Sequence, residues 1–171
     1  MPGGTILRDS WEILEHAMGE PDPDWKAIMD VELGVAVRQI AYFYLLTPEG
    51  KTHIKQMLNN CSTYERFMWW FIGDKVMNGM QKFMAITPEN AKESQESVLR
   101  TLKQAGETLS ERGSLDPSGT FGATDLAFCS LAAHCVVPPK SGNGAADLPK
   151  INTFAPAFQD FIAECRQTDA G

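Results

Sequence analysis

The chain lacks an excess of basic residues, a long apolar run and any close pair of cysteines. Its 171 residues carry 15 Lys and Arg against 22 Asp and Glu, a net charge of −7. That balance argues against nucleic acid or an anionic membrane surface as the main partner. The longest apolar stretch, Ile40 to Leu46, is too short to span a bilayer. No basic segment followed by an apolar core opens the sequence, so we expect no secretory signal.

Metal-binding and nucleophilic patterns are also scarce. Four widely spaced cysteines without a CxxC pair indicate buried thiols of a reducing compartment, hence a cytoplasmic location. These are Cys61, Cys129, Cys135 and Cys165. His134 has no His or carboxylate three or four residues after it, so we expect a helix cap or a packed side chain there rather than a ligand. His16 and His53 lie among polar neighbours and indicate no site.

Helix signals, in contrast, recur along the chain, and strand signals do not. Three pairs place a capping residue before a proline at the first helical position: Asp22-Pro23, Thr47-Pro48 and Thr87-Pro88. Ser62 and Glu65 have the spacing of a capping box. We predict helices over about 24–46, 48–58, 63–86 and 155–167. A polar helix after Thr87 carries a narrow apolar stripe of Val98, Leu102, Ala105 and Leu109.

The content of these segments predicts an all-α bundle with one core. With 171 residues, 43% of them hydrophobic, the chain is long enough to form a single core. The segment 63–86 has a broad apolar face that suits a central hairpin, and its Trp and Met side chains more often fill a core than a binding surface. The segment 140–150 is rich in Gly, Ser, Ala and Asn, which is typical of a loop.

The most informative stretch is 119–128, Gly-Thr-Phe-Gly-Ala-Thr-Asp-Leu-Ala-Phe. With Gly122 as the N-cap, Asp125 falls at the third helical position, where its carboxylate can accept from the N-cap amide. Phe121 and Leu126 then have the spacing of a hydrophobic staple. The residues that follow are small and apolar on nearly every side, which predicts a helix in the middle of a bundle.

This stretch resembles the C-terminal, all-helical domain of the cytosolic glutathione transferases, whose central helix opens with a hydroxyl residue, two small residues and an Asp. Gly122 stands where that family usually has Ser or Thr. The reciprocal bond from a cap side chain is therefore missing. Glycine is still a fair N-cap, less favourable than Ser or Thr by about a few tenths of a kcal/mol, so we expect the helix to start here.

The stretch from Gly4 to Leu14 resembles the last strand and last helix of the thioredoxin-like half of the same family. There an acidic or amide residue followed by Ser opens the helix and holds the γ-glutamyl end of glutathione. The resemblance implies glutathione binding by Asp9 and Ser10, with Ser10 as N-cap. From the residues alone, Ser10 simply caps a surface helix whose buried side carries Ile13, Leu14, Ala17 and Met18.

Taken together, the resemblance implies two parts: a remnant of a thioredoxin-like domain over 1–20 and the helical domain over 21–171. The family's catalytic Tyr, Ser or Cys and its cis-proline have no counterpart here, so no catalytic residue is assigned. The resemblance implies a hydrophobic substrate site on the face that carries Val37, Ala41 and Tyr44. An aromatic stripe at this spacing is, however, more often core.

Two function classes follow. One is a glutathione transferase-family protein of detoxification that binds glutathione conjugates or hydrophobic electrophiles and is inactive unless an N-terminal half completes it. The other is a non-catalytic assembly module, like the transferase-like domains of translation factors and tRNA synthetases. In the first, glutathione is a substrate or ligand, and we expect no metal or other cofactor. We expect an apolar patch including Ile6, Leu7 and Trp11 to be covered by a partner chain or a homodimer, or else the chain to be poorly soluble.

Overall fold

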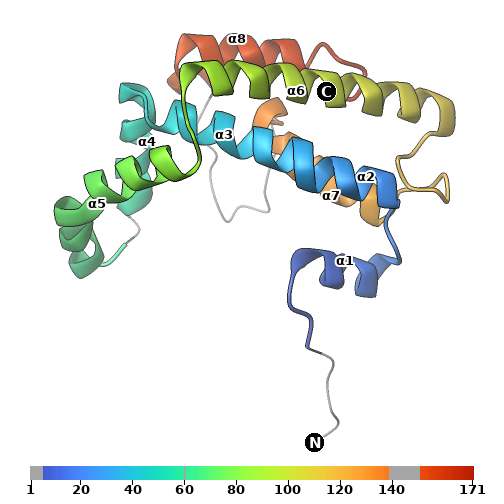
Figure 1. Cartoon of the computed structure of the whole chain (residues 1–171), viewed down its shortest axis with the longest axis horizontal. Coiled ribbons are helices and arrows are strands. Elements are labelled where there is room, and N and C mark those ends of the chain that lie inside the picture. Colours follow the sequence, from blue (N-terminus) through green and yellow to red (C-terminus); the bar gives the residue numbers. More distant parts are fainter. Residues whose placement is uncertain (1–5, 60, 139–150) are drawn as a thin grey trace, which may run out of the picture.

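The computed structural model describes residues 6–59, 61–138 and 151–171, and the regular elements of these segments are all helical (Figure 1). The α-helices are α1 (Ser10–Met18), α2 (Pro23–Ile28), α3 (Gly34–Leu45), α4 (Pro48–Leu58), α5 (Thr63–Phe83), α6 (Pro88–Arg112), α7 (Ala123–Val136) and α8 (Pro156–Cys165). A π-helical turn, η1 (Met29–Leu33), joins α2 to α3, and a short 3-10 turn, η2 (Ile151–Thr153), precedes α8. The all-α prediction is confirmed for this part of the chain. The residues 6–8 form no strand, and the other positions of the expected strand, Gly4 and Thr5, lie outside the described residues, as do 140–150.

The predicted helix starts are present. Asp22 Oδ1 accepts hydrogen bonds from the N–H groups of Asp24 and Trp25 and so caps α2. Ser62 and Glu65 form the capping box at the start of α5, and the Thr87 side chain caps α6. The predicted helix over 24–46 is found as α2, η1 and α3 in succession. These starts could be predicted because a cap depends on neighbours within one turn.

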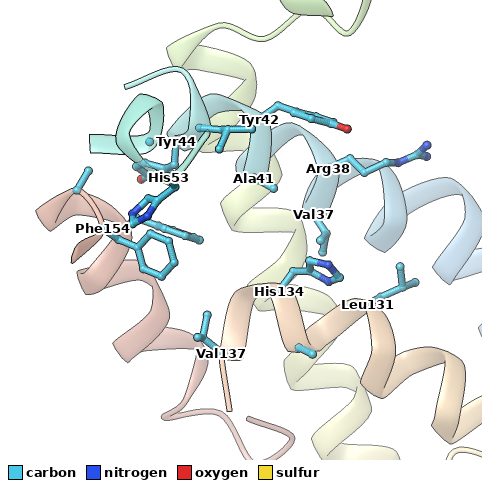
Figure 2. Close-up of a pocket in the computed structure, with 15 residues that line it drawn as sticks. Val37, Arg38, Ala41, Tyr42, Tyr44, His53, Leu131, His134, Val137 and Phe154 are labelled. Atoms are coloured by element: carbon cyan, nitrogen blue, oxygen red, sulfur yellow. The ribbon is translucent and has the colours of Figure 1, made fainter. Parts of the chain in front are cut away.

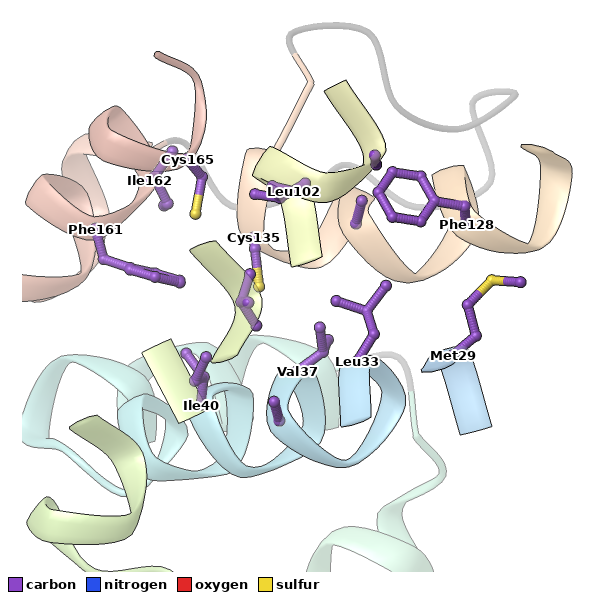
Figure 3. Packing of buried hydrophobic residues seen from close by; sticks show 14 of the residues in the cluster. Met29, Leu33, Val37, Ile40, Leu102, Phe128, Cys135, Phe161, Ile162 and Cys165 are labelled. Atoms are coloured by element: carbon purple, nitrogen blue, oxygen red, sulfur yellow. The ribbon is translucent and has the colours of Figure 1, made fainter. Parts of the chain in front are cut away.

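Helices α2 and α3, with the turn η1 between them, form one continuous segment that we call the α2–α3 rod. The core lies between this rod and helices α6, α7 and α8 (Figure 3). Met29, Leu33 and Ile40 of the rod are at most 1% exposed, as are Val98 and Leu102 of α6. The other sides are closed by Phe128 and Cys135 of α7 and by Phe158, Phe161, Ile162 and Cys165 of α8. Each large side chain buried in this way contributes about 2 kcal/mol to folding. The apolar stripes predicted for the segment 24–46 and for the helix after Thr87 thus face one another in the core.

The buried fraction of the cysteines differs from the prediction. Cys135 and Cys165 are buried in the core, but Cys61 is half-buried and Cys129 is exposed. Burial raises the pKa of both core thiols to about 12. Partial burial, with the charge of Asp125 adding to it, also raises the pKa of Cys129.

The thiols should therefore react in two classes. With an aromatic disulfide reagent at mildly alkaline pH, we expect Cys61 and Cys129 to react with the folded protein, and Cys135 and Cys165 only after denaturation, because the thiolate is the nucleophile. Cys129→Ser should remove about half of the fast absorbance change. Fast labelling of all four thiols in the folded protein would contradict this arrangement.

Helix α5 overturns the prediction of a central apolar hairpin. Among its described residues only Gly73 is buried, whereas Trp70 is 76% and Phe83 is 93% exposed. The core cluster takes no residue from the described positions between Tyr44 and Val98. Figure 1 shows α4 and α5 at one end of the α3–α6 pair. An apolar pattern predicts a helix with an apolar face, but it does not show whether the core of the same chain buries that face.

The start of α7 is held by one buried carboxylate. Asp125 Oδ2 accepts from Gly122 N–H at 3.0 Å and from Ser114 Oγ at 2.7 Å, and Oδ1 accepts from Leu115 N–H at 2.8 Å. Phe121 is 64% exposed and Leu126 is 37% exposed, so the expected staple buries little surface. The all-round burial expected of α7 is wrong, because Cys129, Ser130 and His134 are exposed.

Candidate functional site

A cavity of about 610 Å³ opens beside α3, α7 and the segment from η2 to α8 (Figure 2). Three of its lining residues are the ones expected to form a hydrophobic substrate site: Val37, Ala41 and Tyr44. The remaining wall is mostly aliphatic and aromatic, from Leu45, Leu131, Ala133, Val137, Phe154, Ala155 and Phe158. Such a lining suits a largely apolar ligand of drug-like size.

Tyr44 forms the wall of this cavity rather than a free phenol donor. Its ring stacks on Phe158, with 4.4 Å between the ring centroids and 18° between the planes. Its hydroxyl oxygen accepts a hydrogen bond from Gln95 Nε2 at 2.8 Å. Burial raises the pKa of Tyr44, although the bond from Gln95 works in the opposite direction. The interpretation of this stripe as core therefore fits Tyr44, which is 8% exposed.

Four polar side chains line the same cavity: Arg38, Tyr42, His53 and His134. Arg38 Nε donates to the carbonyl of Gly34 at 2.9 Å, which holds the base of its side chain against α3. His134 is exposed rather than the cap or packed residue that its position in sequence predicts. Figure 2 shows His53 beside Phe154, and His134 near Val37.

His53 is one of the lining residues that sequence reasoning missed. Its ring is 6% exposed, lies 5.2 Å from the Phe154 ring, and has Nε2 3.2 Å from the carbonyl oxygen of Thr153. The contact with Thr153 joins positions 100 residues apart in the chain. Nothing in its polar sequence neighbours signals this contact, because it depends on how α4 folds back against η2.

A second cavity, of about 500 Å³, lies between α1, the α2–α3 rod and α7. Ser10, Trp11, Ile13 and Leu14 line it from α1. Arg38 and Leu131 line both this cavity and the first one. The region expected to hold glutathione and the region expected to hold an electrophile are thus neighbours, with Arg38 at their boundary.

The cap of α1 differs from the prediction by one residue. Asp9, not Ser10, is the N-cap: its Oδ1 accepts from Glu12 N–H at 2.8 Å, while Glu12 Oε2 accepts from Arg8 N–H at 2.6 Å. Ser10 is the first helical residue, and it lines the second cavity. Asp9 does not line that cavity, so the structure does not bring the two predicted glutathione residues to one site.

Helix α1 is attached to the rod by polar contacts around Trp11. Trp11 Nε1 donates to Asp30 Oδ1 at 2.8 Å, and Lys26 lies over the indole, 5.1 Å from its centroid. Lys26 also pairs with Glu15 at 2.8 Å, and this hydrogen bond raises the pKa of Lys26. Ile13, which also lines the second cavity, is 52% exposed. Of the expected apolar patch, Ile6 is 83% exposed, whereas Leu7 and Trp11 are half-buried.

No group of three or more His, Cys, Asp or Glu side chains suited to a metal ion occurs within 6–59, 61–138 and 151–171. In the same segments, no helix combines the length and the apolar character needed to cross a bilayer. No model of a known protein family matches the chain, and neither a curated protein nor a solved structure matches it. The functional argument therefore depends on the residues and on the two adjoining cavities.

Proposed function

We propose that this chain binds a hydrophobic small molecule in the cavity lined by Val37, Ala41 and Tyr44, as the electrophile-binding part of a glutathione transferase-like protein. The observation that carries the proposal is the common wall of the two cavities. Ser10 lines one and Val37, Ala41 and Tyr44 line the other, and Arg38 and Leu131 line both. A glutathione conjugate has a charged peptide and an apolar substituent, which matches two adjoining cavities of this kind.

The chain contributes binding rather than chemistry in this proposal. No cysteine lines either cavity in the described part of the chain, and the Tyr44 hydroxyl is engaged by Gln95. A thiolate nucleophile needs a nearby group that lowers its pKa. We assign no residue here to that role, so glutathione transfer would require a further half that supplies it.

Isothermal titration with glutathione and with S-hexylglutathione tests the proposal. We expect the S-hexyl conjugate to bind, and Ala41→Trp to weaken it by about tenfold or more, since an indole would occupy the apolar cavity. Val35→Trp is the matched control, because Val35 is a 41% exposed residue of the same helix that lines neither cavity. Equal affinity for both Trp variants would overturn the site assignment.

Ser10→Ala tests the peptide end of the ligand. Because Asp9 makes the cap, the substitution leaves the capping hydrogen bond of α1 intact. Weaker binding of the conjugate would therefore report a lost ligand contact rather than an unravelled helix. An unchanged affinity would restrict binding to the hydrophobic cavity.

The assembly-module alternative has one specific observation in its favour, the exposed aromatic helix α5. It predicts no heat with glutathione, with the S-hexyl conjugate or with an uncharged apolar aromatic ligand. That result would reject the ligand-binding proposal and would direct attention to protein partners.

A further inference from the structure

We propose, building on the function proposed above, that Val137 limits the size of the apolar group that the hydrophobic cavity accepts, and that Arg166 holds Val137 in place. Val137 is the C-cap of α7. It lines the cavity of about 610 Å³ together with Val37, Ala41 and Tyr44. Figure 2 shows Val137 at the end of α7, across this cavity from Ala41 on α3.

Val137 has a backbone conformation that is unfavourable for valine. Its φ is 46° and its ψ is 68°, which lies in the left-handed region. Many helices end on a residue in this region, but that residue is usually Gly or Asn, because a branched Cβ is crowded there. Among the described residues, Ala85 is the only other non-glycine residue with a positive φ. Strained residues of this kind persist only where their surroundings hold them.

Two sets of contacts hold Val137. Its side chain is 8% exposed and packs in the core cluster. Arg166, the C-cap of α8, donates from Nε to the carbonyl oxygen of Val136 at 2.7 Å and from Nη2 to the carbonyl oxygen of Val137. A positive charge is favourable at this end of α7, where carbonyl groups lack helical partners. One guanidinium therefore binds the peptide group on each side of the Val137 Cα, and so restrains both φ and ψ.

Loss of the Arg166 hydrogen bonds should let Val137 leave the left-handed region. Pro138 follows it in the sequence, and a proline disfavours helical backbone at the residue before it. A released Val137 should therefore become extended, the conformation that suits a branched side chain. Because the Cα–Cβ bond turns with the backbone, its isopropyl group would leave the cavity wall. Arg166 itself lines neither cavity, so it acts through Val137.

The identity of residue 137 has opposite effects on stability and on the cavity. A glycine would end α7 without strain, but it would leave this part of the wall without a side chain. Valine fills the space at the expense of an unfavourable backbone. A side chain in a wall excludes ligand atoms from the volume that it occupies, so we expect Val137 to limit how long an alkyl group can be.

Isothermal titration with S-hexylglutathione and S-octylglutathione tests this limit. We expect Val137→Gly to raise the ratio of S-octyl to S-hexyl affinity about tenfold, because two more methylene groups enter the vacated space and each is worth about fourfold. The matched control is Ala85→Gly. It also replaces a left-handed residue with glycine, but at an exposed position that lines neither cavity. The control should leave the ratio unchanged.

Arg166→Ala tests the positioning role. The side chain is exposed, so we expect the variant to fold, which circular dichroism would show. We expect the affinity ratio to rise at least about threefold in the wild-type background. In a Val137→Gly background the same substitution should have little effect on the ratio, because no side chain is left to position. A purely structural Arg166 would lower the midpoint of urea unfolding in both backgrounds and leave the ratio unchanged.

The failure of this inference can be told apart from that of the proposed function. If wild type binds the conjugates but Val137→Gly leaves the ratio unchanged, Val137 does not set the limit. If Arg166→Ala leaves the ratio unchanged, or changes it equally in both backgrounds, Arg166 does not act through Val137. A wild type that binds neither conjugate would overturn the proposed function and the role of both residues together.

Discussion

Replacing Asp125 with Asn is expected to lower the free energy of unfolding by about 3 to 5 kcal/mol, since hydrogen bonds to a charged group are each worth about 1.5 to 3 kcal/mol. The carboxylate accepts from three donors, Gly122 N–H, Ser114 Oγ and Leu115 N–H. An amide has only one oxygen, so at least one of these buried donors loses its acceptor. Urea denaturation followed by circular dichroism would measure the change.

The matched control for this substitution is Asp160→Asn on α8. Asp160 is exposed, and in the described structure its carboxylate accepts no hydrogen bond. We expect a change within about 0.5 kcal/mol. Similar losses for the two variants would mean that the network around Asp125 does not hold the start of α7.

Replacing Gly122 with Ser should destabilise the protein by about 2 kcal/mol, although N-cap preference alone predicts a gain of about a few tenths. A Cβ at Gly122 would lie 2.5 Å from Asp116 Cγ and 3.0 Å from Asp116 Cβ. Asp116 has little freedom to move away, because its Oδ1 accepts from Ser118 N–H at 3.1 Å and from Ser118 Oγ at 2.8 Å. The midpoint and slope of urea unfolding would give the sign of the change.

Two further variants separate the steric clash with Asp116 from the effect of a capping side chain. Asp116→Gly should reduce the loss caused by Gly122→Ser, since the two positions then no longer compete for space. Ala155→Ser at the N-cap of α8, where no side-chain cap bond exists, should instead stabilise the protein by about 0.5 to 1 kcal/mol. A stabilising Gly122→Ser would show that α7 tolerates a cap side chain and that Asp116 moves freely.

The same pair explains why position 122 carries Gly rather than Ser or Thr. Asp116 lies close to the Gly122 backbone, and its Oδ2 is 3.4 Å from Thr124 Oγ1. Burial alone would raise the pKa of Asp116, but hydrogen bonds from Ser118 and Thr124 outweigh it and lower the pKa. A charged Asp116 thus occupies the space that a cap side chain at position 122 would need.

Features that depend on neighbouring residues could be predicted from the sequence, whereas contacts between distant residues could not. Caps at Asp22, Ser62 and Thr87 could be read because each depends on residues within one turn. The predicted N-cap of α1, Ser10, is one position from the observed cap, Asp9. Asp and Ser are nearly equal as N-caps, so only the structure shows that the Asp9 side chain accepts the capping hydrogen bond. The contact of His53 with Thr153 spans 100 residues and has no local signature.

The candidate site was predicted in part for the same reason. Val37, Ala41 and Tyr44 share one helical face, so their common wall follows from helical periodicity. His134 and Arg38 complete that wall from α7 and α3, and their part in it depends on how two helices pack. The exposure of α5 could not be predicted, because its residues have the composition of a core segment.

The position of α4 and α5 outside the core has a consequence for motion. A segment that supplies no residue to the core cluster can open without breaking the contacts between α3, α6, α7 and α8. Proteins open in cooperative units whose free energies range from near zero to that of global unfolding. We therefore expect α4 and α5 to open at a lower free-energy cost than the bundle, so that their amide hydrogens should exchange with solvent while the bundle remains folded.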